Sequence, residues 1–405
     1  MYKEIIKEFQ QDFKEKQVLK RNIDFPYEIL DLNKIISFVW PRRAGKTYFM
    51  FYILKQLVKD SKIKLEDIVF IDFSSFLEKN FDVNKLLEDF YSLYPDGKPF
   101  FVFDEIQELE EFSKPVLYLF NKWYKIFLSW SNSKLLSSEL STQFRWRTYD
   151  IKVFPLSFNE FLSFKNIEQK KAYTTKEKWK LQNLLTEYIQ YGAYPEIVLV
   201  DNTNIKQDLI KGYFEILLYK DLIERYGISN EYVLKYLFKK VLLNTTKEFS
   251  TTKTLNELKS QNINLWIQSI YNYLEYMEDI FLIKQLDDLY KTRNRKYYLY
   301  DVAFVNLINK NNFWQRFENI VFTHLFRKYE NVNYVKNNKW KLDFVINNKI
   351  FQVCYDLNYE NFEREIKLLN SIENKQKYII YFNNQKDLKS NDINLIDFFE
   401  FIEDF

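Results

Sequence analysis

The sequence predicts an α/β protein whose first domain is built on a parallel sheet. The apolar run 35–39 is followed by a short loop, by Gly-Lys-Thr at 45–47 and by a helical pattern. Two more apolar runs, 68–72 and 100–104, alternate with helical stretches. Strands that alternate with helices favour a parallel sheet covered on both faces.

The composition excludes several kinds of protein. A chain of 405 residues with 47% hydrophobic residues is long enough for two or three globular domains. Its net charge of +3 is too small to indicate nucleic acid or an anionic membrane. The single cysteine, Cys354, excludes internal disulfides, and the single histidine, His324, argues against histidine-based metal sites. We find no membrane-spanning run and no signal-peptide pattern, so we expect no membrane partner and a cytoplasmic protein.

The segment 34–52, KIISFVWPRRAGKTYFMFY, carries the strongest functional signal. Its strand, loop and helix match the phosphate-binding P-loop, in which backbone N–H groups at a helix N-terminus surround phosphates. Lys46 would reach the terminal phosphates of ATP, and the Thr47 hydroxyl would hold Mg²⁺. The candidate nucleotide-binding residues are Trp40, Pro41, Arg42, Arg43, Ala44, Gly45, Lys46 and Thr47.

One position departs from this motif, because G-x-x-x-x-G-K-[ST] has glycine where the chain has Trp40. The chain turns sharply at that glycine and lies close to the nucleotide, and a side chain opposes both. We therefore infer that the segment derives from a nucleotide-binding loop. Whether the chain with Trp40 in place binds nucleotide is a separate question.

The apolar strand 100–104 ends in two adjacent carboxylates, Asp104 and Glu105. A strand of this kind is the usual partner of a P-loop. Asp104 would hold Mg²⁺ together with Thr47, and Glu105 would orient or activate the attacking water.

Three later residues are candidates for sensing the nucleotide. Asn132 follows a further strand at 125–129 and would detect the γ-phosphate, with a helix N-cap as its alternative role. Arg145 and Arg147 would act as arginine fingers, with a solvated surface pair as the alternative. A finger that acted on a neighbour's nucleotide would imply an oligomer.

Changes of pattern along the chain divide it into five expected segments. The second helix of the fourth segment carries Glu275, Glu278 and Asp279, so a packing role is favoured there over DNA binding. The segments are a helical lead-in (1–33), a P-loop domain (34–165), a helical lid or linker (166–245), a winged-helix-like module (246–312) and a small α/β/α unit (313–405).

With these elements the chain resembles a family of prokaryotic AAA+-like ATPases. In that family a P-loop domain is followed by a helical and winged-helix region and then by a restriction-endonuclease-like domain. The resemblance covers nearly the full length and implies a P-loop AAA+-type parallel-sheet domain with ATPase chemistry that uses ATP and Mg²⁺. The matching stretches are PRRAGKT (41–47), VFDEIQ (102–107), SNSKLLSSEL (131–140), VFPLSFNEFL (153–162), YGAYPE (191–196), NYLEYMEDIFLI (272–283), KYYLYDVAF (296–304), FENIVFTHL (317–325), LDFVI (342–346) and QVCYDL (352–357).

The last domain resembles nucleases of the PD-(D/E)XK class, which gather Mg²⁺ and a water with an Asp and a Glu-x-Lys on neighbouring strands. Asp343 and the helix residue Glu318 resemble the acidic positions of that class. The Glu-x-Lys position reads Gln352-Val-Cys354, which offers neither an anionic ligand nor an ammonium group. We therefore expect a domain that does not cut DNA.

Glycine is rare in this chain, with 5 residues, while tryptophan occurs 8 times. Six tryptophans stand where the family pattern or a tight turn favours glycine. We hypothesise that UGA codons, read as glycine in the source organism, are written here as Trp; the alternative is an inactive ATPase with genuine Trp. The six are Trp40, Trp130, Trp146, Trp266, Trp314 and Trp340, and Trp123 and Trp179 would follow.

The leading function is an ATP-binding and ATP-hydrolysing AAA+-like ATPase that couples its nucleotide state to the C-terminal half. The alternative is a nucleotide-independent interaction scaffold, and a weaker alternative is a Mg²⁺-dependent DNA nuclease. A protein partner or DNA would bind through the C-terminal half.

Overall fold

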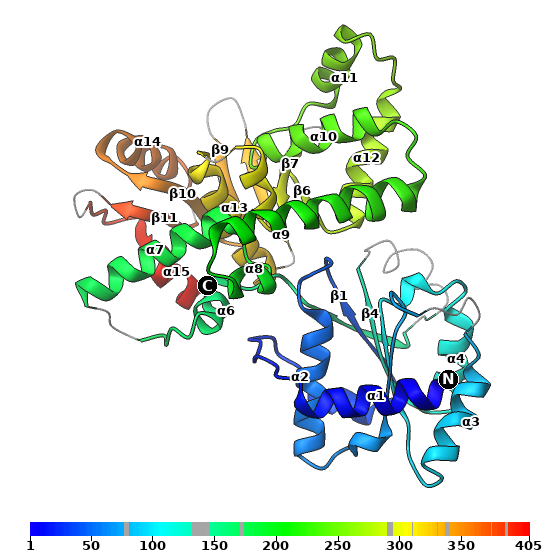
Figure 1. The fold of residues 1–405 in the computed structure, drawn as a ribbon. Coiled ribbons are helices and arrows are strands. Elements are labelled where there is room, and N and C mark those ends of the chain that lie inside the picture. Colours follow the sequence, from blue (N-terminus) through cyan, green and yellow to red (C-terminus); the bar gives the residue numbers. More distant parts are fainter. Residues whose placement is uncertain are drawn as a thin grey trace. The chain divides into compact units, whose positions relative to one another are not determined.

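A computed structural model describes most of the chain and divides it into two compact units, 1–155 and 156–405 (Figure 1). The first unit includes the expected lead-in and ends before the expected boundary at residue 165. The other expected segment boundaries stay predictions. The described residues are 1–76, 81–131, 144, 146–170, 174–289, 295–309, 311–329, 331–336, 341–373, 375–384 and 388–405.

The first unit contains the predicted parallel sheet, with five strands in the order β2-β3-β4-β1-β5. All four neighbouring pairs are parallel. Every residue of β1 and β3 is buried, which explains why both strands are apolar on both faces. The strands are β1 (Ile35–Val39), β2 (Ile68–Asp72), β3 (Phe100–Asp104), β4 (Lys125–Trp130) and β5 (Thr148–Lys152).

Helices flank this sheet, with α2 on one side and α3 and α4 on the other (Figure 1). The first helix is fixed by a buried side chain, Gln10, whose amide donates to the carbonyls of Glu66 and Ile68 at 3.0 and 3.2 Å. The lead-in is therefore part of the sheet domain. The helices are α1 (Tyr2–Glu15), α2 (Lys46–Lys59), α3 (Val83–Leu93) and α4 (Ser113–Asn121), with short 3-10 turns η1 (Tyr27–Asp31), η2 (Leu65–Asp67) and η3 (Ile106–Glu108).

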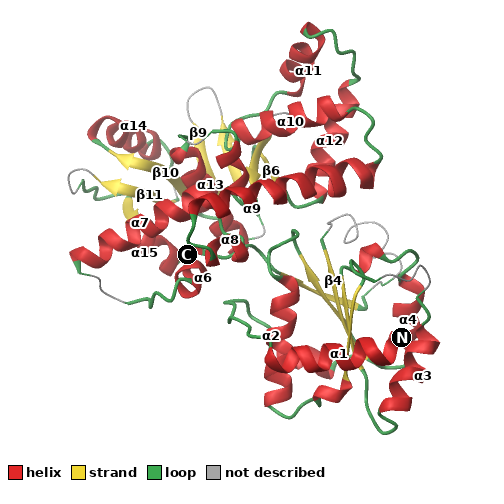
Figure 2. Ribbon diagram, in the orientation of Figure 1, coloured by secondary structure: helices red, strands yellow, loops and turns green. Residues whose placement is uncertain are grey.

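The second unit begins with a mostly helical stretch (Figure 2). Capping boxes start α6 and α7, with Ser157 and Thr174 at the N-caps and with Glu160 and Glu177 in the first turns. Across the described ranges, no helix is both long enough and apolar enough to cross a bilayer. The elements are α6 (Phe158–Phe164), α7 (Thr175–Tyr191), α8 (Pro195–Leu199), α9 (Thr203–Ile216), the π-helical continuation η5 (Leu217–Glu224), α10 (Glu231–Leu243), α11 (Thr251–Ser260) and α12 (Ile267–Asp279).

The rest of the second unit carries two sheets. Strands β6 and β7 form an antiparallel pair, and the last segment forms a mixed sheet in the order β12-β11-β10-β9-β8. Helix α13 contributes Phe317 and Val321 to a core that also contains Phe344 and Phe351 of the mixed sheet. The elements are β6 (Ile283–Asp287), β7 (Arg295–Leu299), η6 (Ala303–Leu307), α13 (Phe313–Lys328), β8 (Asn333–Lys336), β9 (Lys341–Ile346), β10 (Lys349–Leu357), α14 (Tyr359–Asn370), β11 (Gln376–Asn384), β12 (Asn394–Asp397) and α15 (Phe398–Asp404).

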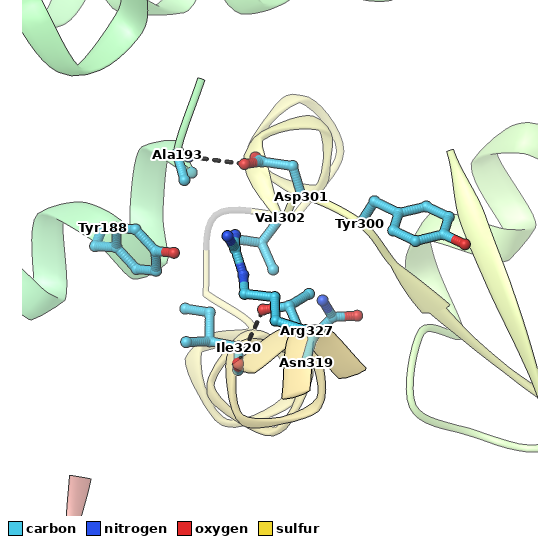
Figure 3. Close-up of a pocket in the computed structure, with 10 residues that line it drawn as sticks. Tyr188, Ala193, Tyr300, Asp301, Val302, Asn319, Ile320 and Arg327 are labelled. Atoms are coloured by element: carbon cyan, nitrogen blue, oxygen red, sulfur yellow. Dashed lines mark hydrogen bonds between the residues drawn. The ribbon is translucent and has the colours of Figure 1, made fainter. Parts of the chain in front are cut away.

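A buried carboxylate joins two turns of the second unit. Asp301 accepts hydrogen bonds from the backbone N–H of Ala193 and of Ala303, both at 2.8 Å. Burial raises the pKa of Asp301 to about 7. Figure 3 shows Asp301 bonded to Ala193, with the Arg327 side chain extending into the same small hollow. The carboxylate therefore holds the turn after α7 against the turn after β7.

Gly192, beside that carboxylate, should not tolerate a side chain. Its φ is +76°, and an added Cβ would lie 2.0 Å from Oδ1 of Asp301. We expect Gly192→Ala to lower the free energy of unfolding by at least about 1–3 kcal/mol, because the backbone is strained and the carboxylate must move. Denaturant titration of the full chain measures this change.

The matched control is Gly212→Ala in α9, where an added Cβ would meet nothing within 4 Å. This substitution should be neutral or stabilise the chain by up to about 1 kcal/mol, because alanine favours helix. Equal stability of the two variants would contradict the proposed role of the Asp301 contact.

Candidate functional site

The loop between β1 and α2 has the backbone of a phosphate-binding loop. Gly45 lies at the N-cap of α2 with φ +92°, and Arg43 also has a positive φ of 67°. The N–H of Ala44 donates to the carbonyl of Pro41 at 3.3 Å, which closes the turn. The first N–H groups of an α-helix point away from its hydrogen-bond ladder, so the N-terminus of α2 is a place at which an anion can bind.

Lys46 lies under this loop and is only 4% exposed. Its Nζ donates to the carbonyl oxygens of Trp40 and Pro41 at 2.9 and 3.0 Å. The same atom lies 3.9 Å from Oε1 of Glu105. The ammonium group is therefore held mainly by neutral carbonyls, which it can leave for a charged phosphate oxygen.

Thr47 and Asp104 meet across the edge of the sheet. The Thr47 hydroxyl donates to Oδ2 of Asp104 at 2.6 Å, and the Ser129 hydroxyl donates to the other carboxylate oxygen. Burial raises the pKa of Asp104 to about 6. At neutral pH the group is therefore ionised, and a hydroxyl beside a carboxylate is a donor set that suits Mg²⁺.

Glu105 follows directly, with an unusual positive φ of 49°. Burial alone would raise the pKa of Glu105, but Lys46 and Arg42 lower it below its ordinary value. The side chains of Gln107 and Ser131 also donate to its carboxylate. Glu105 is therefore an ionised, fixed hydrogen-bond acceptor beside Lys46.

The two loop arginines differ in their surroundings. Arg42 forms an ion pair with Glu108 at 2.8 Å, while Arg43 is exposed. The structure brings together Lys46, Thr47, Asp104 and Glu105 as the sequence predicted. Their charges and donors fit a nucleoside triphosphate with Mg²⁺.

Trp40 takes the place of the first motif glycine and is buried, with 4% of its surface exposed. Its φ of 143° lies in the region that favours glycine. The indole packs on Phe154, with ring centroids 4.5 Å apart, and the ammonium of Lys152 lies 5.9 Å from the ring. The backbone therefore has the conformation that the motif requires of a glycine.

The other tryptophans differ in their backbone conformation. Trp123 and Trp146 have positive φ angles of 65° and 59°, so the backbone there also favours glycine. Trp266 does not fit the expected pattern, because its φ is −78°. Trp130 lies in β4 and Trp314 in α13, which are regular elements, and Trp340 lies outside the described residues.

The predicted sensing residues are placed only in part. Asn132 and Arg145 lie outside the described residues. The carbonyl of Arg147 accepts from the N–H of Ile35, at the start of β1. Because β1 and β5 are parallel, Arg147 lies at the opposite end of the sheet from the loop, about 15 Å away along a five-residue strand. The prediction that Arg147 reaches a phosphate is therefore wrong for the nucleotide of its own chain.

The structure also reveals a buried charge cluster in the second unit. Nζ of Lys296, on β7, lies 3.7 Å from Oε1 of Glu318 on α13 and 3.9 Å from Oδ1 of Asp343 on β9. Lys296 is fully buried. Burial raises the pKa of Glu318 and lowers that of Lys296. The two acidic residues that resemble a nuclease site are therefore joined by an ammonium group.

The neighbouring Gln352 and Cys354 offer little chemistry. The side-chain oxygen of Gln352 accepts from the N–H of Asp343 at 3.2 Å. Burial raises the pKa of Cys354, so its thiol is neutral. Gln352 acts here as a support for the Asp343 strand.

The sequence prediction missed several residues of both sites. Ser129, Ser131 and Gln107 support the carboxylates of the first site, and Lys296 neutralises those of the second. Polar residues at the end of the apolar strand 125–130 are a usable signal for the serines. Lys296 lies in the quoted stretch 296–304, but nothing in that stretch shows its partner.

Two family models match this chain. Residues 32–162 match the model described as an AAA domain, and residues 182–313 match a domain of unknown function. The first match covers the parallel sheet and the phosphate-binding loop. The first unit is therefore an AAA domain of the P-loop ATPase type.

Two solved structures resemble this chain at low sequence identity. The Walker-type ATPase of Pyrococcus abyssi is 14% identical with a TM-score of 0.49, covering 72% of this chain and 98% of that chain. AMPPCP-bound DnaA from Aquifex aeolicus is 12% identical with a TM-score of 0.27, covering 68% and 86%.

Two relatives match over most of their length. An uncharacterised protein of Methanocaldococcus jannaschii is 37% identical over 98% of this chain and 88% of its own. An uncharacterised protein of Haemophilus influenzae is 30% identical over 86% of this chain and 89% of its own. The chain therefore belongs to the same family as these two proteins, and in this chain residues 32–162 form an AAA domain.

Proposed function

We propose that the protein binds and hydrolyses ATP with Mg²⁺ and couples the nucleotide state to its second unit. The observation that carries the proposal is the meeting of Lys46, Thr47 and Asp104 at one edge of the sheet. Bound Mg²⁺ would neutralise charge on the phosphates. The AAA-domain match over 32–162 supports the same chemistry.

Each residue of the site has one expected role. Lys46 would leave the carbonyls of Trp40 and Pro41 for the terminal phosphates, and Thr47 and Asp104 would hold Mg²⁺. Glu105, ionised and fixed by Gln107 and Ser131, would orient the attacking water. Asn132 would sense the γ-phosphate, and an arginine finger from Arg145 or Arg147 would act on a neighbour's nucleotide, which requires an oligomer.

The roles of the second unit are part of this proposal. Helices α11 and α12 with the β6–β7 hairpin have the order of a winged-helix module, and the mixed sheet with α13 and α14 has the order of a nuclease-like domain. Glu275, Glu278 and Asp279 favour a packing role for this module over DNA binding, and Glu278 and Asp279 pair with Lys284 and Tyr226. A protein partner or DNA would bind through the C-terminal half. The Lys296 ammonium group beside Glu318 and Asp343 supports a nuclease-like domain that does not cut.

We further propose that Trp40, Trp123 and Trp146 are glycines in the native protein. Their positive φ angles support recoded UGA codons. Peptide mass spectrometry of the protein from its native cell should find glycine at position 40. Tryptophan at that position would contradict recoding and favour the nucleotide-independent scaffold.

ATP with Mg²⁺ should stabilise the protein against heat. At ATP a hundredfold above its dissociation constant, the binding energy of about 2.7 kcal/mol should raise Tm by about 5–10 °C. The measurement compares the chain with Trp40 and its Trp40→Gly variant. A shift only in Trp40→Gly would show that the indole blocks a functional loop, and no shift in either would support the scaffold.

Matched variants separate binding from hydrolysis. Lys46→Ala should abolish the shift, while Lys59→Ala, an exposed lysine at the end of the same helix, should keep it. Glu105→Gln should keep the shift but slow phosphate release by about a hundredfold or more. The exposed Glu110→Gln is its control, and equal rates for both would remove Glu105 from the mechanism.

Lys296→Met should destabilise the second unit by about 3–5 kcal/mol, because buried Glu318 loses the cation at 3.7 Å and Asp343 keeps only the half-exposed Lys341 at 3.5 Å. Lys296→Met with Glu318→Gln should recover part of this loss. Denaturant titration measures the free energy of unfolding of both variants. The control is Lys284→Met, which removes a partly exposed ion pair with Glu278 and should cost under about 1 kcal/mol. Mg²⁺-dependent nicking of DNA by the unmodified chain, lost in Asp343→Asn, would instead support the nuclease.

A further inference from the structure

The segment between α1 and η1 supplies a buried cation to the phosphate-binding loop. Arg21 is 4% exposed. Its Nη1 donates to the carbonyl of Ala44 at 2.8 Å, and its Nη2 donates to the carbonyl of Phe154 at 2.7 Å. One guanidinium group therefore joins the loop before Gly45 to the chain just after β5. The planar guanidinium can serve two acceptors at once, which a single ammonium group cannot do with the same geometry.

The two carbonyls that Arg21 binds belong to the phosphate-binding loop and to the end of the first unit. Ala44 is a fully buried residue of the loop that surrounds the phosphates. Phe154 is the last residue but one of the first unit, which ends at Pro155. Arg21 thus bonds the loop to the point at which the chain leaves the AAA domain.

The exit segment is held to the loop by two further contacts. The N–H of Val153 donates to the carbonyl of Val39 at 2.9 Å, and the Phe154 ring packs on Trp40. A displacement of the loop therefore acts on 153–154 through backbone and guanidinium contacts that do not depend on the side chain at position 40.

The next residues are fixed within the second unit. The N–H of Leu156 donates to the carbonyl of Ala193 at 2.8 Å, and its carbonyl accepts from the Tyr188 hydroxyl at 2.8 Å. Only Pro155, with its restricted φ, separates these anchors from Phe154. The connection is therefore short.

We propose that Arg21 is a positioning residue that transmits the rearrangement of the phosphate-binding loop to the start of the second unit. The proposal rests on the proposed ATP binding. To reach a phosphate, Lys46 must give up the carbonyls of Trp40 and Pro41, so the backbone of this loop changes its bonding when nucleotide binds. Arg21 holds the same loop through Ala44 and passes the change to Phe154.

Hydrogen–deuterium exchange on the full chain tests this role, with and without the non-hydrolysable analogue AMP-PNP and Mg²⁺. The form used is whichever of the Trp40 chain and Trp40→Gly binds the analogue. The analogue should slow exchange at 40–47 and alter exchange at 153–164. In Arg21→Lys the slowed exchange at 40–47 should persist. The change in exchange at 153–164 should fall at least about threefold, because one ammonium group replaces a guanidinium that donates to two carbonyls.

Two further variants keep the test decisive. Lys20→Met, at the exposed neighbouring position, should respond as the parent chain does. Arg21→Gln, which retains a donor without the charge, replaces Arg21→Lys if that variant fails to fold, and the same loss is expected. A full response at 153–164 in either Arg21 variant would overturn the proposal. So would protection at 40–47 with no change at 153–164 in the parent chain, whereas no protection at 40–47 in any form would refute ATP binding itself.

Discussion

The common direction of the five strands in the first unit is the constraint on which its site depends. Because β1, β3 and β4 are parallel neighbours, their carboxyl ends lie at one edge, and the residues that follow them meet there. Thr47 can therefore reach Asp104 although 57 positions separate them in sequence. A slip of one residue in either pairing would turn Asp104 to the other face of the sheet. The apolar runs that bury both faces of β1 and β3 fix the register, so the core positions the charged groups.

The two buried lysines of this protein show how surroundings decide what a cation can do. Lys46 is held by two neutral carbonyls, with Glu105 farther away at 3.9 Å. Lys296 lies between two carboxylates and is fully buried. Withdrawing Lys296 would take a cation from two buried carboxylates, of which Asp343 would keep Lys341 at 3.5 Å. Withdrawing Lys46 would release two carbonyls that a small backbone movement can satisfy and would take from Glu105 a cation that a bound Mg²⁺ would replace nearby. The first arrangement can exchange partners during a cycle, and the second stabilises one state.

Local signals were sufficient for most of the first unit. Strands 68–72 and 100–104 were predicted with the observed bounds, because continuous apolar runs that end in charged residues leave little choice of register. The phosphate-binding loop was predicted from the Gly-Lys-Thr motif, and Asp104 and Glu105 were predicted as its partners because they end an apolar strand. The position of Arg147 could not be predicted, because sequence distance to the loop says nothing about which end of a parallel strand a residue occupies. Arg21 and Lys296 were not found, since their partners are distant carbonyls and carboxylates that no local pattern identifies.

The three tryptophans with positive φ in the described residues have strained backbones, and they differ in how much burial of the side chain offsets that strain. A residue other than glycine in a sparsely populated positive-φ conformation costs of order 1–3 kcal/mol. Trp40 offsets part of that cost, because its indole is buried against Phe154. Trp123 and Trp146 are 74% and 90% exposed, so they bear the same strain with little burial in return. Genuine Trp at these two positions would lower stability without a visible gain, whereas glycine would remove the strain. Backbone strain alone therefore favours glycine at the two exposed turns, while in the phosphate-binding loop the φ of Trp40 and the motif favour it together.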